Sequence, residues 1–113
     1  MLRSTYAAFN ERDIEVALAA MHPDVDWPNG FEGGREHGRE AVRAYWTRQF
    51  KVLDSRADPV GFSEDEEGRT VADVHQVVRD PDGRLIADQR VRHVYTLRDG
   101  LVTRMDIEGP PPE

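Results

Sequence analysis

The sequence predicts an α+β fold in which a curved antiparallel sheet carries the N-terminal helices on one face. Two observations predict this class. The first half of the chain has apolar residues at helical spacing, and the second half reads as strands joined by the turn signatures DPDG (80–83) and RDG (98–100). Helices followed by hairpins are typical of a sheet covered on one face. We expect a single domain over residues 1–109 and a disordered tail at 110–113.

The helices are predicted from the spacing of apolar side chains. Tyr6 and Phe9 lie three residues apart and share one face of a first short helix. Asp13 is placed as the N-cap of a second helix, which we expect to end at the His-Pro pair 22–23. A short strand then ends on Trp27, and a glycine-rich loop leads to a third helix over 39–53.

A strand register follows if each turn signature closes with a glycine bulge, so that residue 79 faces 85 and residue 97 faces 101. One set of odd-numbered side chains then shares a face, which we expect to lie against the helices. The set comprises Val71, Asp73, His75, Val77, Ala87, Gln89, Val91, His93, Tyr95, Thr103, Met105 and Ile107. The even-numbered face is more charged, and we expect it to face outward.

The composition argues against several partners. The net charge is −7 and the basic residues are spread along the chain, so we expect neither nucleic acid nor an anionic membrane as a partner. The chain has no cysteine, no apolar run of transmembrane length and no apolar segment typical of a signal peptide. We therefore expect a soluble, cytoplasmic protein.

Three segments resemble the nuclear transport factor 2-like superfamily, in its SnoaL-like polyketide cyclase and ketosteroid isomerase branch. They are YAAFNERDIEVALAAMHPDVDWPNG, GREAVRAYW and RVRHVYTLRDGLVTRMDI, and together they cover most of the chain in the order the family has them. The resemblance implies a cone-shaped fold with a mostly apolar pocket, and often a homodimer through the outer sheet face. The fold hosts many activities, so it does not fix the function.

The residues that would carry steroid isomerisation are altered. By resemblance, the position of the catalytic base falls on Trp27, and Asp26 is one residue off and points to the other side of its strand. The oxyanion tyrosine aligns with Thr5, or with Tyr6 if the first helix shifts by one, and the protonated aspartate aligns with His93. We therefore reject steroid isomerisation. The Asp-Arg-Asp set that resembles epoxide hydrolases is also absent, because positions 89, 91 and 93 read Gln, Val and His.

The remaining polar residues of the odd-numbered face suggest proton transfer. In the assumed register Asp73 lies diagonal to His93, within reach of its imidazole, and can raise the basicity of that ring. His75 would be the partner acid, and the resemblance to scytalone dehydratase, which uses two histidines, is compatible with this. The two histidines lie too far apart for one metal ion, so we expect no metal. The expected ligand-binding residues are Trp27, Tyr6, Trp46, Gln89, Val91, Tyr95, Met105 and Ile107.

Three functions stay open from the sequence. The first is a cofactor-free cyclase, isomerase or dehydratase that acts on a small apolar carbonyl compound, with His93 as base or oxyanion donor positioned by Asp73. The second is a non-catalytic dimeric module that binds a small apolar molecule or serves as an accessory domain, favoured by the tryptophan at position 27. The third is a domain whose sheet face serves oligomerisation alone.

Overall fold

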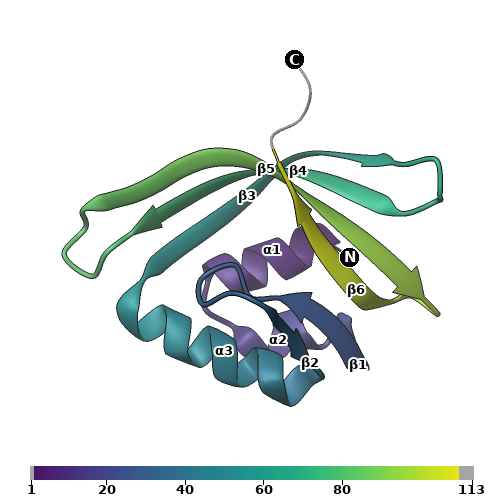
Figure 1. The fold of residues 1–113 in the computed structure, drawn as a ribbon, viewed down its shortest axis with the longest axis horizontal. Helices are drawn as coiled ribbons and strands as arrows, with labels where there is room; N and C mark the ends of the chain where they lie inside the picture. Colours follow the sequence, from purple (N-terminus) through teal and green to yellow (C-terminus); the bar gives the residue numbers. More distant parts are fainter. Residues whose placement is uncertain (1, 110–113) are drawn as a thin grey trace.

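The computed structural model describes residues 2–109 as one curved sheet that arches over three helices (Figure 1). The helices are α1 (Leu2–Asn10), α2 (Ile14–Leu18) and α3 (Arg39–Val52). The strands are β1 (Met21–Pro28), β2 (Arg35–His37), β3 (Asp54–Glu64), β4 (Thr70–Arg79), β5 (Leu85–Arg98) and β6 (Leu101–Glu108). The predicted tail at 110–113 lies outside the described residues.

The six strands lie in the order β2-β1-β6-β5-β4-β3, so β2 and β3 form the two edges and the sheet stays open. The α+β class is confirmed. The sheet is not wholly antiparallel, because β1 runs parallel to β6 while every other neighbouring pair is antiparallel. The chain reaches β1 directly from α2, which lets this early strand join the C-terminal strand.

Two predicted boundaries in the first half differ from the structure. Asp13 does cap α2, accepting a hydrogen bond from the amide of Val16 at 3.3 Å, but the helix ends at Leu18 rather than at the His-Pro pair. Met21 belongs to β1 and is buried in the core. The predicted glycine-rich loop contains the short edge strand β2, which pairs with the end of β1.

The predicted register between β4 and β5 is wrong by one residue beyond the turn. Arg79 faces Leu85 as expected, but a bulge at Ile86 makes Val78 face Ala87 and shifts every later pair. Because side chains alternate along a strand, one inserted residue moves the whole of β4 to the opposite face relative to β5. The even-numbered residues of β4 therefore face the helices.

The register between β5 and β6 also differs from the prediction, but the faces are kept. Asp99 and Gly100 both have positive φ, of 54° and 80°, so the turn is the tight two-residue type rather than one with a glycine bulge. A further irregularity near Thr96 brings Tyr95 opposite Met105, where the expected partner was Thr103. A total shift of two residues preserves the alternation.

Side-chain contacts to backbone fix α1 against β3, at the edge of the sheet. The side chain of Asn10 donates to the carbonyl of Ala57 at 2.8 Å and accepts from its amide at 2.9 Å. Arg12 donates to the carbonyl of Ser55 at 2.7 Å, and its guanidinium stacks on Phe50 at 4.3 Å from the ring centre. These contacts hold the C-terminal end of α1 against β3.

Helix α3 is fixed to β1 at its first turn. Gly38 donates its amide to the carbonyl of Val25 at 2.7 Å and has φ of 88°, a conformation that glycine adopts without strain. Arg39 donates through Nε to the carbonyl of Met21 at 2.7 Å. Within residues 2–109, no helix is long and apolar enough to cross a membrane.

Candidate functional site

A cavity of about 440 Å³ lies between the concave face of the sheet and helices α1 and α3. Its wall contains all eight residues expected to bind a ligand: Tyr6, Trp27, Trp46, Gln89, Val91, Tyr95, Met105 and Ile107. Their placement agrees with the prediction, while their role in binding stays a prediction. Phe31, Ile86 and Ile107 are among the exposed large apolar residues of the chain and mark the rim.

Aromatic side chains form much of the inner wall. Trp27 packs edge-on against Trp46, with ring centres 5.7 Å apart, and lies tilted against Tyr95 at 6.4 Å. Phe9 contacts the other side of Trp46, at 5.4 Å. Edge-on contacts of this kind are favourable and hold the rings in defined orientations. The cavity therefore presents rigid, flat apolar surfaces from α1, α3, β1 and β5.

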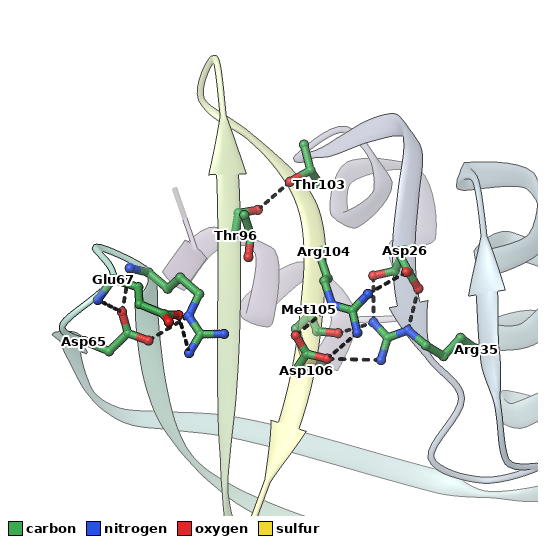
Figure 2. Close-up of polar contacts among 10 residues, drawn as sticks. Asp26, Arg35, Asp65, Glu67, Thr96, Thr103, Arg104, Met105 and Asp106 are labelled. Atoms are coloured by element: carbon green, nitrogen blue, oxygen red, sulfur yellow. Dashed lines mark hydrogen bonds and ion pairs between the residues drawn. The ribbon is translucent and has the colours of Figure 1, made fainter.

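Trp27 points into the cavity because its neighbour Asp26 is held on the outer face of the sheet (Figure 2). Asp26 pairs with Arg35 of β2 and with Arg104 of β6, the latter at 2.8 Å. Asp106 pairs with the same two arginines, at 3.3 and 2.9 Å, so the four side chains form a closed ring of alternating charge. Arg35 also donates to the carbonyl of Met105 at 2.6 Å. The ring joins β2, β1 and β6 and fixes which face Trp27 takes.

A chain of three buried polar groups runs from β5 to α1. The hydroxyl of Tyr95 donates to the hydroxyl oxygen of Tyr6 at 2.6 Å, and the Tyr6 hydroxyl lies 2.7 Å from Nδ1 of His93. Tyr6 and His93 also stack at 5.8 Å between ring centres. Tyr6 and Tyr95 line the cavity, whereas His93 is not part of its wall. Tyr6 therefore lies between His93 and the cavity.

All three groups of this chain are uncharged at neutral pH. Burial lowers the pKa of His93 to about 4, so the imidazole is neutral, and its tautomer decides whether Nδ1 accepts from the Tyr6 hydroxyl or donates to it. Burial, and then interaction with Tyr95, raises the pKa of Tyr6 far above its usual value. Burial likewise raises the pKa of Tyr95, although the hydrogen bond to Tyr6 opposes this. The tyrosines act as hydrogen-bonding groups and not as bases.

The predicted catalytic set is not brought together. Asp73 lies opposite Arg92 and His75 opposite Arg90, on the outer face of the sheet, because of the bulge at Ile86. Nε2 of His75 lies there 2.6 Å from Oδ1 of Asp88, within hydrogen-bond distance. The prediction that Asp73 positions His93 is therefore wrong.

The wall of the cavity is uncharged. Among the residues that the structure describes, no Asp, Glu, Lys, Arg or His side chain lines it. No group of three potential metal ligands occurs within 2–109 either. The polar wall residues that could contact a ligand are hydroxyl and amide side chains.

Two amide groups on facing walls, those of Gln49 and Gln76, were not singled out by the sequence. On α3, Gln49 is buried, and its Nε2 donates weakly to the hydroxyl of Tyr45 at 3.3 Å, while its Oε1 has no hydrogen-bond partner. On the sheet, Gln89 donates to Oε1 of Gln76 at 3.1 Å. Gln49 was visible in the sequence as a polar residue within the apolar spacing of the third helix. Gln76 was assigned to the outer face by the wrong register.

The chain belongs to the SnoaL-like domain family, whose sequence profile matches residues 2–105. The comparison thus agrees with the fold and with the polyketide cyclase and isomerase branch expected from the sequence. A comparison with curated proteins found no match.

Several solved structures share the fold. A nuclear transport factor 2-like protein of unknown function from Burkholderia pseudomallei is 29% identical, with a TM-score of 0.81 over 96% of this chain and 86% of that one. TerC, co-crystallised with polyporic acid, is 34% identical, with a TM-score of 0.78 over 91% and 83% of the two chains. A candidate polyketide cyclase from Xanthomonas campestris pv. campestris is 26% identical, with a TM-score of 0.77 over 94% and 84%.

Proposed function

We propose that the chain binds a small, flat, largely aromatic molecule in the cavity between the sheet and the helices. The observation that carries this proposal is a cavity of about 440 Å³ whose wall combines rigid aromatic rings with hydroxyl and amide groups. Small-molecule sites are of this size and character, with a few polar groups that fix the orientation of the ligand. Trp27 and Trp46 offer ring surfaces for stacking.

The comparison with TerC supports the same proposal. That protein, 34% identical over 91% of this chain, was co-crystallised with polyporic acid. A neutral aromatic ketone such as 2-acetylnaphthalene, which has a flat ring system and a conjugated carbonyl but no acidic hydroxyl, is therefore a concrete first probe.

A blocking variant tests the proposal. Ala87 lines the cavity from β5, and Ala87→Phe fills part of its volume. Val77 belongs to β4, and its odd-numbered position places it on the outer face, so Val77→Phe adds the same ring outside the cavity. Isothermal titration should show micromolar binding of a probe to the wild type and to Val77→Phe, and at least tenfold weaker binding to Ala87→Phe. Absence of binding by all probes, or equal binding by both variants, would contradict the proposal.

A second candidate is proton-transfer catalysis on a carbonyl compound, favoured by the 2.7 Å contact between Tyr6 and His93. If the neutral imidazole carries its proton on Nδ1, His93 and Tyr95 both donate to the oxygen of Tyr6, and the Tyr6 proton is free to donate to a ligand oxygen. Such a donor stabilises negative charge that develops on a carbonyl oxygen. His93 would then be a positioning residue. The described wall offers no carboxylate or imidazole as base, so binding is the better-supported function.

The catalytic candidate is tested by His93→Gln and His93→Ala on a compound that the protein binds and converts. Glutamine keeps a hydrogen-bond donor near Tyr6, so it should retain more turnover than alanine, and the loss should fall on kcat rather than on KM. Full activity of His93→Ala would contradict the role of His93.

We further propose a homodimer through the outer face of the sheet, as the sequence suggested. That face carries the cross-strand pair Val71 and Val94 next to the charged pair Asp73 and Arg92. Sedimentation velocity between 1 and 200 μM tests the proposal, and a monomer across this range would contradict it.

A further inference from the structure

We propose that the cavity takes its ligand in the un-ionised form and excludes both anions and cations of similar shape. This inference rests on the proposed binding function and adds a chemical class to it: neutral aromatic ketones, phenols and amides rather than carboxylates or amines. It follows from the absence of charged side chains in the described cavity wall and from the carboxylates near Tyr45.

The wall supplies no partner for an ion. Each described residue in it is apolar or carries a neutral polar group, which is a hydroxyl, an amide or an indole N–H. Burying an ion among apolar groups without a countercharge is costly, whereas a neutral carbonyl or hydroxyl loses much less on leaving water. A ligand of one shape therefore binds more strongly as a neutral molecule than as an ion.

The titratable groups at the cavity add no charge to its wall between pH 5.5 and 8. They are Tyr6 on α1, Tyr45 on α3 and Tyr95 on β5, with His93 behind Tyr6. Burial raises the pKa of each of the three tyrosines, and it lowers that of His93 to about 4. The strands β1, β3, β4 and β6 add no titratable side chain to the described wall. The wall stays neutral between pH 5.5 and 8.

Two acidic side chains, those of Glu32 and Glu36, lie close to Tyr45 of the cavity wall. Glu32 and Glu36 act electrostatically on Tyr45 and contribute to its raised pKa. Both carboxylates are hydrogen-bonded to Nδ2 of Asn29, at 3.1 and 2.9 Å, and Glu32 also pairs with Arg48. Negative charge at this position opposes the entry of an anionic ligand. It attracts a cation to the rim but offers it no partner inside.

Three naphthalene probes of matched shape test the inference: 2-acetylnaphthalene, 2-naphthoic acid and 2-(aminomethyl)naphthalene. The ketone should bind with the same Kd at pH 5.5 and 7.5. A carboxylic acid ionises near pH 4, so its neutral fraction falls about tenfold per pH unit, and its apparent Kd should rise about a hundredfold over the same range. The amine, which is protonated throughout, should bind at least tenfold more weakly than the ketone.

A variant pair isolates the role of charge inside the cavity. Gln76 lines the cavity from β4 and is half-buried, so Gln76→Lys places a cation there and Gln76→Met removes the amide without adding charge. At pH 7.5, Gln76→Lys should lower the Kd for 2-naphthoate at least tenfold, and Gln76→Met should not. An unchanged Kd in Gln76→Lys contradicts the inference, provided that circular dichroism shows a folded variant.

The outcomes separate the inference from the function on which it rests. If none of the three probes binds, the proposed binding function fails. If the ketone binds but naphthoate binds equally well at pH 5.5 and 7.5, or the amine binds more tightly than the ketone, the binding function stands and the selection for un-ionised ligands is wrong.

Discussion

The hydroxyl of Tyr6 lies 2.7 Å from Nδ1 of His93, and Tyr6 separates this histidine from the cavity. The relationship joins the first helix to the fifth strand, across 87 positions of sequence. It also assigns the two residues different places: Tyr6 can touch a ligand, and His93 can act on a ligand through Tyr6.

Tyr6→Phe should destabilise the protein more than Tyr95→Phe. Tyr6 is the central member of the chain, so its loss leaves both the hydroxyl of Tyr95 and Nδ1 of His93 buried without a partner. The expected cost is about 1–3 kcal/mol for Tyr6→Phe and about 0.5–1.5 kcal/mol for Tyr95→Phe, which removes one hydrogen bond. Urea denaturation at pH 7.5 measures both. Equal costs would mean that the three groups do not act as a chain.

Stability should fall as the pH drops from 6.5 to 4, and His93 should cause much of the fall. The buried imidazole has a pKa of about 4, whereas an unfolded histidine titrates near 6.5. Between these values the unfolded chain binds a proton that the folded chain does not, so the free energy of unfolding decreases as the pH falls, by about 3 kcal/mol in total. Above pH 6.5 this contribution is complete.

The variant His93→Gln should flatten this pH dependence, and the exposed His37→Gln should leave it unchanged. Urea denaturation at pH 7.5, 6.5, 5.5 and 4.5 gives the slopes. The account of His93 as a buried neutral base is contradicted if the wild type and His93→Gln lose stability in parallel.

Asp26→Asn should open the ring of charges on the outer face. Asp26 contacts both Arg35 and Arg104, and all of these side chains are about one-third exposed or more, so the expected loss is about 0.5–1 kcal/mol. Asp24→Asn makes the same change of charge on the same strand, at an exposed position. We expect almost no effect from it. The Asp26→Asn loss should shrink in 1 M NaCl, since salt screens these charges; a loss that does not shrink would contradict the ionic origin.

Gln49→Leu should leave the stability unchanged or raise it by up to about 1 kcal/mol, because it removes a buried amide oxygen that has no partner. Gln89→Leu is the control, since Gln89 is exposed and hydrogen-bonded to Gln76. Thermal unfolding compares the two. A loss of more than about 1 kcal/mol in Gln49→Leu would mean that the amide is satisfied in the folded protein.

Much of the fold could be predicted from the sequence because local signals agree with it. Asp13 is a helix N-cap, and the apolar spacing of α3 places Trp46 on the buried face. The opposite orientations of Asp26 and Trp27 follow from the alternation of side chains in a strand. The C-terminal end of α2 could not be predicted from local spacing, because Met21 joins a strand beside β6 and this pairing depends on the tertiary structure.

The candidate site was predicted less completely, for a specific physical reason. The bulge at Ile86 inserts a single residue, and nothing in the local sequence marks it. That residue moves Asp73 and His75 to the outer face and brings Gln76 to the cavity. The hydrogen bond between Tyr6 and His93 depends on how α1 lies over β5, which local patterns do not encode.

The most direct test of the central claim uses the chain's own two tryptophans, Trp27 and Trp46, which both line the cavity. Titration of the wild type, Ala87→Phe and Val77→Phe with 2-acetylnaphthalene at pH 7.5 reports occupancy through tryptophan fluorescence. We predict saturable quenching in the wild type and in Val77→Phe. In Ala87→Phe the apparent Kd obtained from the quenching curve should be at least tenfold higher. Quenching that is linear and unsaturable, and identical in all three proteins, would contradict the claim that this cavity is a ligand site.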